Sequence, residues 1–186
     1  MMKNLHFFTL TEMDELARPD GDPSWTLASP ALEFFTDFNQ VEPLVIENSL
    51  SALEARLWMK KTHTQLQCVI DDKGQFIGII SEEDLIDLKF VQKVSEGVNR
   101  KDISLMDLMI PKRKLRVLDY CDVAESTIAD IICTLQNVGE RYCLVMDRQQ
   151  HKIRGVFSAQ DISKKLHLPV NIGEKPSFTC LFSATI

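Results

Sequence analysis

The stretch Gly-Ile-Ile-Ser-Glu-Glu-Asp-Leu at residues 78–85 returns as Gly-Val-Phe-Ser-Ala-Gln-Asp-Ile at residues 155–162. In both copies a glycine and two apolar residues precede a serine, and an aspartate comes three residues after the serine. The chain has 186 residues, so one copy lies in each half. Similar segments at such a spacing indicate that one structural unit occurs twice.

The segments around each octapeptide repeat one order of elements. A short apolar strand is followed by an amphipathic helix, which we expect Ser49 to cap in the first unit and Asp122 in the second. Two strands that form a hairpin then lead into the octapeptide, and a further helix starts at its serine. The apolar face of the first helix consists of Leu50, Leu53, Leu57 and Trp58. The expected strands are 44–46, 66–70 and 76–80 in the first unit and 115–118, 142–146 and 153–157 in the second.

Neither half can bury its apolar faces alone, because each is a three-stranded sheet with helices on it. We therefore predict an α/β (α+β) fold in which two tandem β-α-β-β-α units pack with pseudo-two-fold symmetry. The repeat divides the chain into an N-terminal arm (1–29), a first unit (30–93), a polar linker (94–102), a second unit (103–168) and a C-terminal tail (169–186). The spacing of Phe178, Leu181, Phe182 and Ile186 predicts a short helix in the tail.

Composition and charge exclude several classes of protein. The net charge of −6 opposes broad attraction to nucleic acid or to anionic lipid. The basic run at 111–116 has no interleaved aromatic residues, so we interpret it as a solvated connection. Neither a signal peptide nor a membrane-spanning run is present in the sequence, and the five cysteines form no C-x-x-C pair. We therefore expect a cytoplasmic protein without membrane contact.

The repeated Ser-x-x-Asp has two interpretations. It is a capping box, in which the hydroxyl and the carboxylate satisfy backbone N–H groups at the first turn of a helix. It also suits a nucleoside phosphate, because a helix N-terminus and a serine favour phosphate and an aspartate can accept hydrogen bonds from ribose hydroxyls. The sequence leaves both interpretations open.

The order of strand, turn, strand and G-h-h-S-x-x-D resembles the cystathionine-β-synthase (CBS) domain. Each copy comes after an apolar strand that ends in aspartate, LQCVID at 66–71 and YCLVMD at 142–147. Two copies in tandem resemble a CBS pair, or Bateman module, over about Pro30 to Leu168. The resemblance implies two clefts that hold an adenine nucleotide (AMP, ADP or ATP) or S-adenosylmethionine as a regulatory ligand.

Carried over by position, the aspartates match the ribose-binding acid and the serines match the hydroxyl on the phosphate side. The matched residues are Gly78, Ile79, Ile80, Ser81 and Asp84 in the first octapeptide, Gly155, Val156, Phe157, Ser158 and Asp161 in the second, and Leu44, Val45, Leu115 and Arg116 on the first strands. Arg154 and Arg141 stand where family members carry a basic residue for phosphate. His63 is the comparable candidate in the first unit, so we expect the second motif to hold the more charged part of a ligand.

We conclude that the chain is a stand-alone regulatory CBS pair that binds an adenosine compound without catalysis and signals in trans. P-loop, dinucleotide, zinc-protease and nucleophile-elbow motifs are absent from the sequence, so neither an enzyme nor a metal site is expected. The resemblance also implies a homodimer and an effector protein of unknown identity. The alternative is a ligand-free dimerisation or interaction module, in which both Ser-x-x-Asp motifs act only as helix caps.

Overall fold

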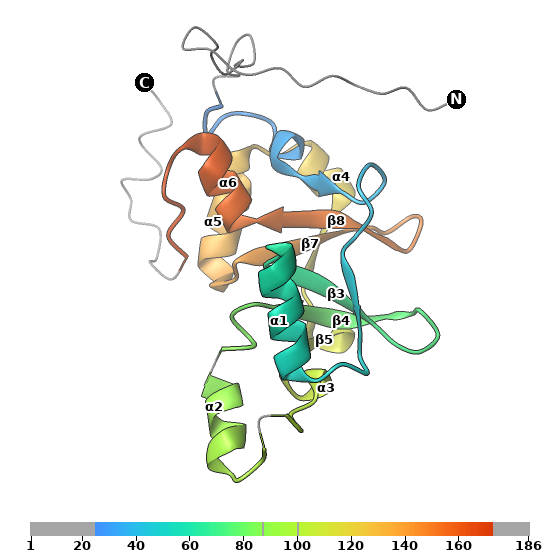
Figure 1. Ribbon diagram of the computed structural model, residues 1–186. Coiled ribbons are helices and arrows are strands. Elements are labelled where there is room, and N and C mark those ends of the chain that lie inside the picture. The colour runs from blue at the N-terminus through green and yellow to red at the C-terminus, as the bar shows by residue number, and fades with distance from the viewer. Residues whose placement is uncertain (1–24, 87, 100, 173–186) are drawn as a thin grey trace, which may run out of the picture.

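The computed structural model describes residues 25–86, 88–99 and 101–172, and it contains two four-stranded sheets with helices packed on them (Figure 1). The first unit holds β2 (Val45–Glu47), α1 (Ala52–Thr62), β3 (Leu66–Ile70), β4 (Phe76–Ser81) and α2 (Leu88–Ser95). The second holds β6 (Val117–Asp119), α4 (Tyr120–Ala124), α5 (Ile128–Val138), β7 (Tyr142–Asp147), β8 (Lys152–Ser158) and α6 (Ala159–Leu166). The predicted fold class is therefore confirmed.

Both sheets have the same topology. In the first sheet the order is β2-β3-β4-β5, where β5 is Ile110–Pro111, with β2 parallel to β3 and the other pairs antiparallel. In the second sheet the order is β6-β7-β8-β1, where β1 is Thr36–Asp37, with β6 parallel to β7 and the other pairs antiparallel. The registers also match, since Leu66 pairs with Ser81 and Tyr142 pairs with Ser158. These pairings make Leu66 and Tyr142 equivalent positions in the two units.

Each sheet is completed by a short strand from the start of the other unit. β5 (Ile110–Pro111) lies near the start of the second unit but pairs with β4 of the first. β1 (Thr36–Asp37) lies near the start of the first unit but pairs with β8 of the second. The two units therefore exchange short edge strands.

The exchange explains the glycine at the start of each octapeptide. A Cβ added at Gly78 would collide with the carbonyl oxygen of Ile110 on β5. A Cβ added at Gly155 would collide with the carbonyl oxygen of Thr36 on β1 and with the ring of Phe35. Glycine is needed where another backbone approaches this closely, so these positions serve strand exchange.

The hydrophobic cores reflect the same exchange. The first core includes residues from α3 (Leu105–Leu108) and its neighbours, whereas the second includes the 3-10 helix η1 (Ala31–Phe34). Trp25 packs edge-on against Phe34, with 5.2 Å between the ring centroids. The second 3-10 helix, η2 (Lys112–Lys114), comes directly after β5 and is exposed. Each hydrophobic core therefore includes side chains from the start of the other unit.

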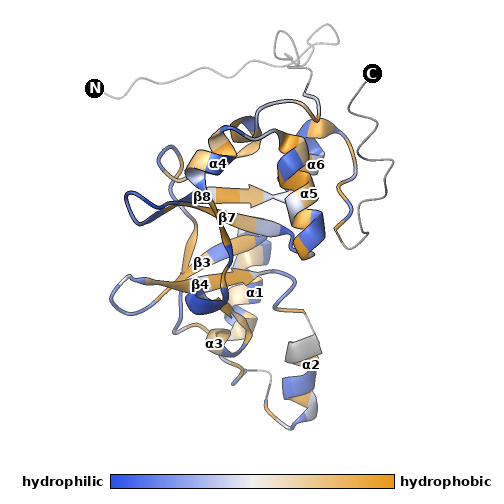
Figure 2. Cartoon of the chain, turned by 180° about the vertical axis from the view of Figure 1, so that it is seen from behind, coloured by the Kyte–Doolittle hydropathy of each residue, from blue (hydrophilic) through white to orange (hydrophobic). Residues whose placement is uncertain are grey.

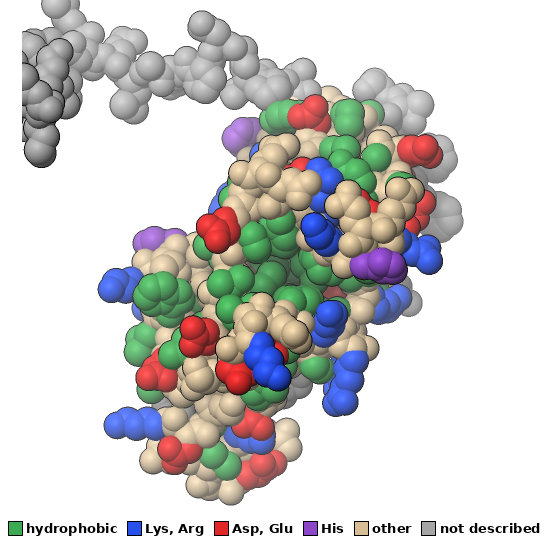
Figure 3. Space-filling view, turned by 90° about the vertical axis from the view of Figure 1, so that its right-hand side faces the viewer, with side chains coloured by type: hydrophobic (Ala, Val, Ile, Leu, Met, Phe, Trp, Pro, Cys, Tyr) green, Lys and Arg blue, Asp and Glu red, His purple; other side chains and the backbone are tan. Residues whose placement is uncertain are grey.

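Figure 2 shows hydrophobic residues along the central strands and hydrophilic residues at the hairpin turns. Seen from the hairpin ends, hydrophobic side chains gather in a hollow between the two units, with charged side chains around it (Figure 3). Within the described ranges, no helix is long and apolar enough to cross a membrane.

The helices differ from the prediction in four details. α1 is capped by Ser51 rather than Ser49, and it buries Ala52, Ala55 and Met59, whereas Leu57 and Trp58 are 61% and 51% exposed. The buried face of α1 therefore consists of two alanines and Met59, and the larger Leu57 and Trp58 lie at the surface.

In the second unit the helix expected from Asp122 is divided into α4 and α5. Asp119 caps α4, and a capping box of Thr127 and Asp130 starts α5. In the first unit, turns rather than a helix come after Ser81, and α2 begins at Leu88. The predicted tail helix lies outside the described residues.

Candidate functional site

Two clefts lie between the units, and each combines one octapeptide with elements of the other unit. The Asp161 cleft has a volume of about 520 Å³ and joins Val156, Ser158 and Asp161 of the second unit to Leu44 and α1 of the first. The Asp84 cleft has a volume of about 270 Å³ and joins Ile79, Ser81 and Asp84 to Arg141 and Tyr142. The two motifs therefore lie in equivalent but unequal clefts.

The Asp84 motif forms a complete capping box. The Asp84 carboxylate oxygen Oδ2 accepts hydrogen bonds from the Ser81 backbone N–H at 2.8 Å and from the Ser81 hydroxyl at 2.6 Å. The Asp84 N–H in turn donates to the Ser81 hydroxyl at 3.2 Å. This carboxylate is engaged within its own turn, as the capping interpretation expects.

The Asp161 motif forms only half of this arrangement. The Asp161 N–H donates to the Ser158 hydroxyl at 3.3 Å, and Ser158 caps α6. The Asp161 carboxylate instead lies 3.8 Å from the ammonium group of Lys164, one turn along α6, and its side chain is 55% exposed. An exposed pair at this distance is weak, so the carboxylate is free to accept other hydrogen bonds.

Pseudo-symmetry is broken at the positions where the two units meet. Since Leu66 is equivalent to Tyr142, the preceding residues Gln65 and Arg141 are also equivalent. Arg141 forms an ion pair with Glu83 at 2.5 Å, beside the Asp84 cleft. At the equivalent place in the other cleft stand two uncharged amides, Gln65 and Gln160. This ion pair lines the Asp84 cleft, whereas the equivalent residues of the Asp161 cleft carry no charge.

Arg154 is placed differently from the sequence-based expectation. Its guanidinium group donates two hydrogen bonds to Asp37 on β1, at 2.8 and 2.9 Å, and lies over the ring of Tyr120 at 4.7 Å. The guanidinium group holds the pKa of Asp37 below its usual range. Arg154 is not among the described residues that line the two clefts, and it secures the exchanged strand β1.

The basic side chains of the Asp161 cleft are Lys60, Lys164 and His63. His63 ends α1 in the left-handed conformation with φ of 53°, at the position where Gly139 ends α5. Sequence reasoning found His63 but missed the two lysines. The signal for Lys60 and Lys164 was their place in the last turn of a helix, which also suits a solvated lysine.

The other predicted site residues do not line either cleft. Ile80 and Phe157 are fully buried in the two cores, and Val45 is 47% exposed on β2. Leu115 and Arg116 come after η2 and are not among the described residues that form the Asp84 cleft. Within the described ranges, no group of three or more His, Cys, Asp and Glu side chains could hold a metal ion.

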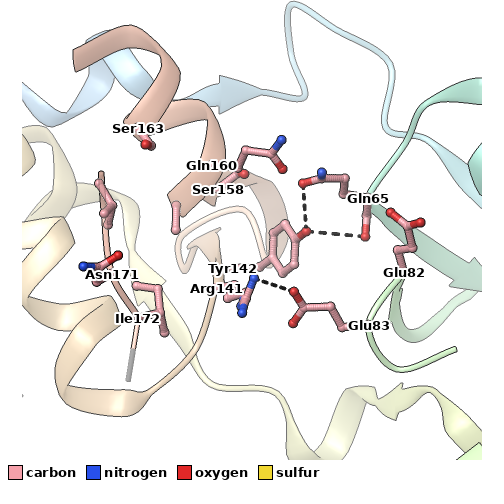
Figure 4. A pocket seen from close by; sticks show the side chains of 12 residues that line it. Gln65, Glu82, Glu83, Arg141, Tyr142, Ser158, Gln160, Ser163, Asn171 and Ile172 are labelled. Carbon is pink, nitrogen blue, oxygen red and sulfur yellow. Dashed lines mark hydrogen bonds and ion pairs between the residues drawn. The ribbon is translucent and has the colours of Figure 1, made fainter. Parts of the chain in front are cut away.

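A third cavity of about 540 Å³ is lined by residues of both units, and we call it the axial cavity (Figure 4). The equivalent residues Gln65 and Arg141 both line it, as do residues 82–83 and 159–160. The Tyr142 hydroxyl donates to the Gln65 side-chain oxygen at 3.4 Å, across the two units. Burial raises the pKa of Tyr142 to about 12, with a further contribution from Glu83. Tyr142 therefore remains a neutral donor at physiological pH.

Residues 36–90 match the family model described as the CBS domain. The solved CBS-domain pair of protein MJ0100 shares 14% identity with this chain, covers 75% of it and 98% of its own length, and superposes with a TM-score of 0.50. The chain contains a CBS domain at residues 36–90, and its fold is that of a CBS pair. The resemblance indicated by the repeated octapeptide is therefore confirmed.

Two further structures share the CBS-pair fold. An uncharacterized conserved protein from Pyrococcus horikoshii is 19% identical, covers 75% of this chain and 93% of its own, and has a TM-score of 0.56. CBSX2, solved in complex with AMP, is 22% identical, covers 73% of this chain and 94% of its own, and has a TM-score of 0.51. No curated protein sequence matches the chain. At these identities the structures establish the fold of the CBS pair.

Proposed function

We propose that this CBS pair is a regulatory module that binds one adenosine compound per chain in the Asp161 cleft, without chemical turnover. The observation that carries the proposal is the difference between the two aspartates. Asp84 accepts two hydrogen bonds from its own turn, whereas Asp161 presents a carboxylate to an open cleft. A carboxylate at this place can accept hydrogen bonds from both hydroxyls of a ribose.

Other residues of the Asp161 cleft suit the rest of a nucleoside. Leu44 and Val156 offer apolar surface for a flat base, and Ser158 offers a hydroxyl at the start of α6. Ligand sites combine apolar walls with a few placed polar groups in this way. Two proteins of the same fold support the choice of ligand, since CBSX2 was solved with AMP and the MJ0100 pair with 5′-methylthioadenosine and S-adenosylmethionine.

Regulation is a consequence of the position of the cleft between the two units. A ligand that contacts both units favours one arrangement of them, and its differential affinity sets the size of the response. We propose that this response is read by an effector protein in trans. The described cysteines are all free thiols, which supports a reducing cytoplasm as the place of action.

We also propose a homodimer, formed through the outer face of α1. Leu57 and Trp58 are adjacent in sequence on this face and are both more than half exposed. Large aromatic residues at a surface are typical of the core of an interface. Trp58→Glu is expected to reduce the molar mass in light scattering from two chains to one, and an unchanged dimer would place the interface elsewhere.

A ligand-free interaction module is the second candidate, and the Asp84 capping box favours it at that motif. Thermal melting with and without adenosine compounds separates the two functions. A ligand at a hundred times its Kd stabilises a protein by about 2.7 kcal/mol. Asp161→Asn is expected to remove this ligand-induced stabilisation and to leave the melting temperature of the free protein nearly unchanged.

Asp84→Asn is the matched control. It is expected to lower the free energy of unfolding by about 1 kcal/mol through loss of the cap, and to keep the ligand-induced stabilisation. If millimolar adenosine compounds leave the melting temperature of the wild-type protein unchanged, the ligand-free module is the better account.

A further inference from the structure

Four basic residues follow β5 in a run that the proposed function does not use. Lys112, Arg113 and Lys114 form η2, and Arg116 comes directly before β6. We call residues 112–116 the basic segment. All four basic residues are exposed, and within the described part of the chain none of them forms an ion pair. Four positive charges therefore face the solvent together in a chain whose net charge is −6.

The internal repeat shows that the fold does not require these charges. Pro111 pairs with Gly78, and Asp37 pairs with Gly155, so the connection after β1 is equivalent to the connection after β5. The connection from β1 to β2, residues 38–44, has the sequence FNQVEPL, which contains one acidic residue and no basic residue. Like charges close together repel one another and oppose the compact state. An interaction with another molecule is therefore a better account of the basic segment than its role as a connection.

The basic segment is attached to both units. β5 holds one end of it against β4 of the first unit, and β6 holds the other end beside β7 of the second. The η2 helix packs on β4, where the ammonium group of Lys112 lies 5.9 Å from the centroid of the Phe76 ring. Figure 2 shows this short helix as a strongly hydrophilic patch next to β4. The charges are therefore presented from a segment that is anchored at both ends.

Apolar surface beside the basic segment favours a protein partner over a nucleic acid. Val117 directly follows Arg116, is 40% exposed, and lines a hollow of about 640 Å³ together with Leu118 and Met146. Arginine and lysine side chains bind carboxylates through charge-assisted hydrogen bonds, and an apolar side chain between carboxylates can contact this hollow. The dense negative charge of DNA is opposed by the net negative charge of the chain.

We propose that the basic segment is a docking surface for an acidic segment of a protein partner. Carboxylates of the partner bind Arg113, Lys114 and Arg116, and an apolar side chain beside them contacts the hollow at Val117. The inference goes beyond the proposed function, because it does not depend on a ligand in the Asp161 cleft. Since the basic segment joins the two units, a partner bound there favours one arrangement of them over another.

Fluorescence anisotropy with labelled probes tests the inference on the full chain. The probes are a peptide of eight glutamates, a peptide of eight glutamines and a DNA duplex of about 20 base pairs. In about 50 mM NaCl, the glutamate peptide is expected to bind at least about tenfold more tightly than the glutamine peptide, and more tightly than the DNA. Binding is expected to weaken several-fold in about 200 mM NaCl, because salt screens exposed charges.

The triple variant Arg113→Gln/Lys114→Gln/Arg116→Gln removes three of the charges and keeps Lys112 over the ring of Phe76. It is expected to weaken binding of the glutamate peptide about tenfold, because each exposed ion pair makes a small contribution and three are lost. Its binding should also depend less on salt than that of the wild-type protein. Urea unfolding checks that the variant is folded.

The triple variant Arg56→Gln/Lys61→Gln/Lys101→Gln is the matched control. It changes the net charge by the same amount at exposed residues outside the basic segment and the hollow. It is expected to change binding of the glutamate peptide by less than about twofold.

Equal affinity for the glutamate and glutamine peptides would overturn the inference, as would equal losses in the two triple variants. Tighter binding of the DNA than of the glutamate peptide would also overturn it and would make the basic segment a nucleic-acid surface. All of these outcomes leave the proposed function intact, because none of them involves the Asp161 cleft.

Discussion

Two aspartates at equivalent positions in the repeat show how local hydrogen bonding decides what a residue can do. Asp84 and Asp161 share the same sequence motif, but the first carboxylate is turned back to its own backbone and the second is not. The motif alone could not separate the two outcomes, because a capping box and a ribose site require the same residues at the same spacing. The difference depends on the backbone after the serine, which forms turns at residues 82–86 in the first unit and the regular helix α6 in the second.

Arg154 stands at a position where a ligand contact is expected, but its role is structural. The family resemblance implies a phosphate contact for Arg154, because it stands where family members carry a basic residue. Its partner Asp37 lies on β1, and nothing in the local sequence indicated that this segment pairs with β8. A long-range pairing of this kind cannot be read from periodicity.

Replacing Asp37 by Asn is expected to destabilise the protein by about 1.5–3 kcal/mol at pH 7, because the partly buried Arg154 loses its charged partner. The pKa of Asp37 is lowered in the folded state, so its contribution to stability is present above the unfolded pKa, near 3.9. This contribution is lost as the pH falls through the folded value. Urea unfolding from pH 7 to pH 3 measures it.

The difference between wild type and Asp37→Asn isolates this pair, because caps also lower the pKa of Glu54 and of Asp130. The gap between the two proteins should close as the pH falls below about 4. A gap that stays constant over this range would contradict the role given to the Asp37 carboxylate.

At the scale of elements, the repeat and the periodicities were sufficient to predict the central strands. β3, β4, β7 and β8 lie within a residue or two of their predicted limits, because alternating or continuous apolar runs bounded by turns are distinctive. The short exchanged strands β1 and β5 were missed, since two residues give no periodic signal. The outer face of α1 was misassigned because apolar residues line both of its sides.

The exchange of segments between the units predicts which unit is destabilised when a core residue is replaced. Phe34→Ala removes a buried ring at the start of the first unit and is expected to lower the free energy of unfolding by about 3–5 kcal/mol. Amide hydrogens should lose protection from exchange mainly in α5, α6 and β8 of the second unit. Leu105→Ala, at the start of the second unit, should instead reduce protection in β3 and β4 of the first. Loss of protection in the unit nearer in sequence would contradict the exchanged packing.

At the scale of the whole molecule, two similar units produce one cleft with about twice the volume of the other. Three differences between equivalent positions accompany this inequality: Gln65 for Arg141, Leu66 for Tyr142 and Gln160 for Glu83. The family and the pseudo-symmetric fold could be predicted from the repeat. The inequality of the clefts could not, because it depends on which side chains meet across the interface.

The central claim is that one adenosine compound binds per chain, in the Asp161 cleft. Calorimetric titration of the full chain with 5′-methylthioadenosine tests this claim most directly, because this small nucleoside can probe both clefts. The account predicts a stoichiometry of one ligand per chain, retained in Asp84→Asn and abolished in Asp161→Asn. Two ligands per chain, or a single site that is lost with Asp84 and kept without Asp161, would contradict it.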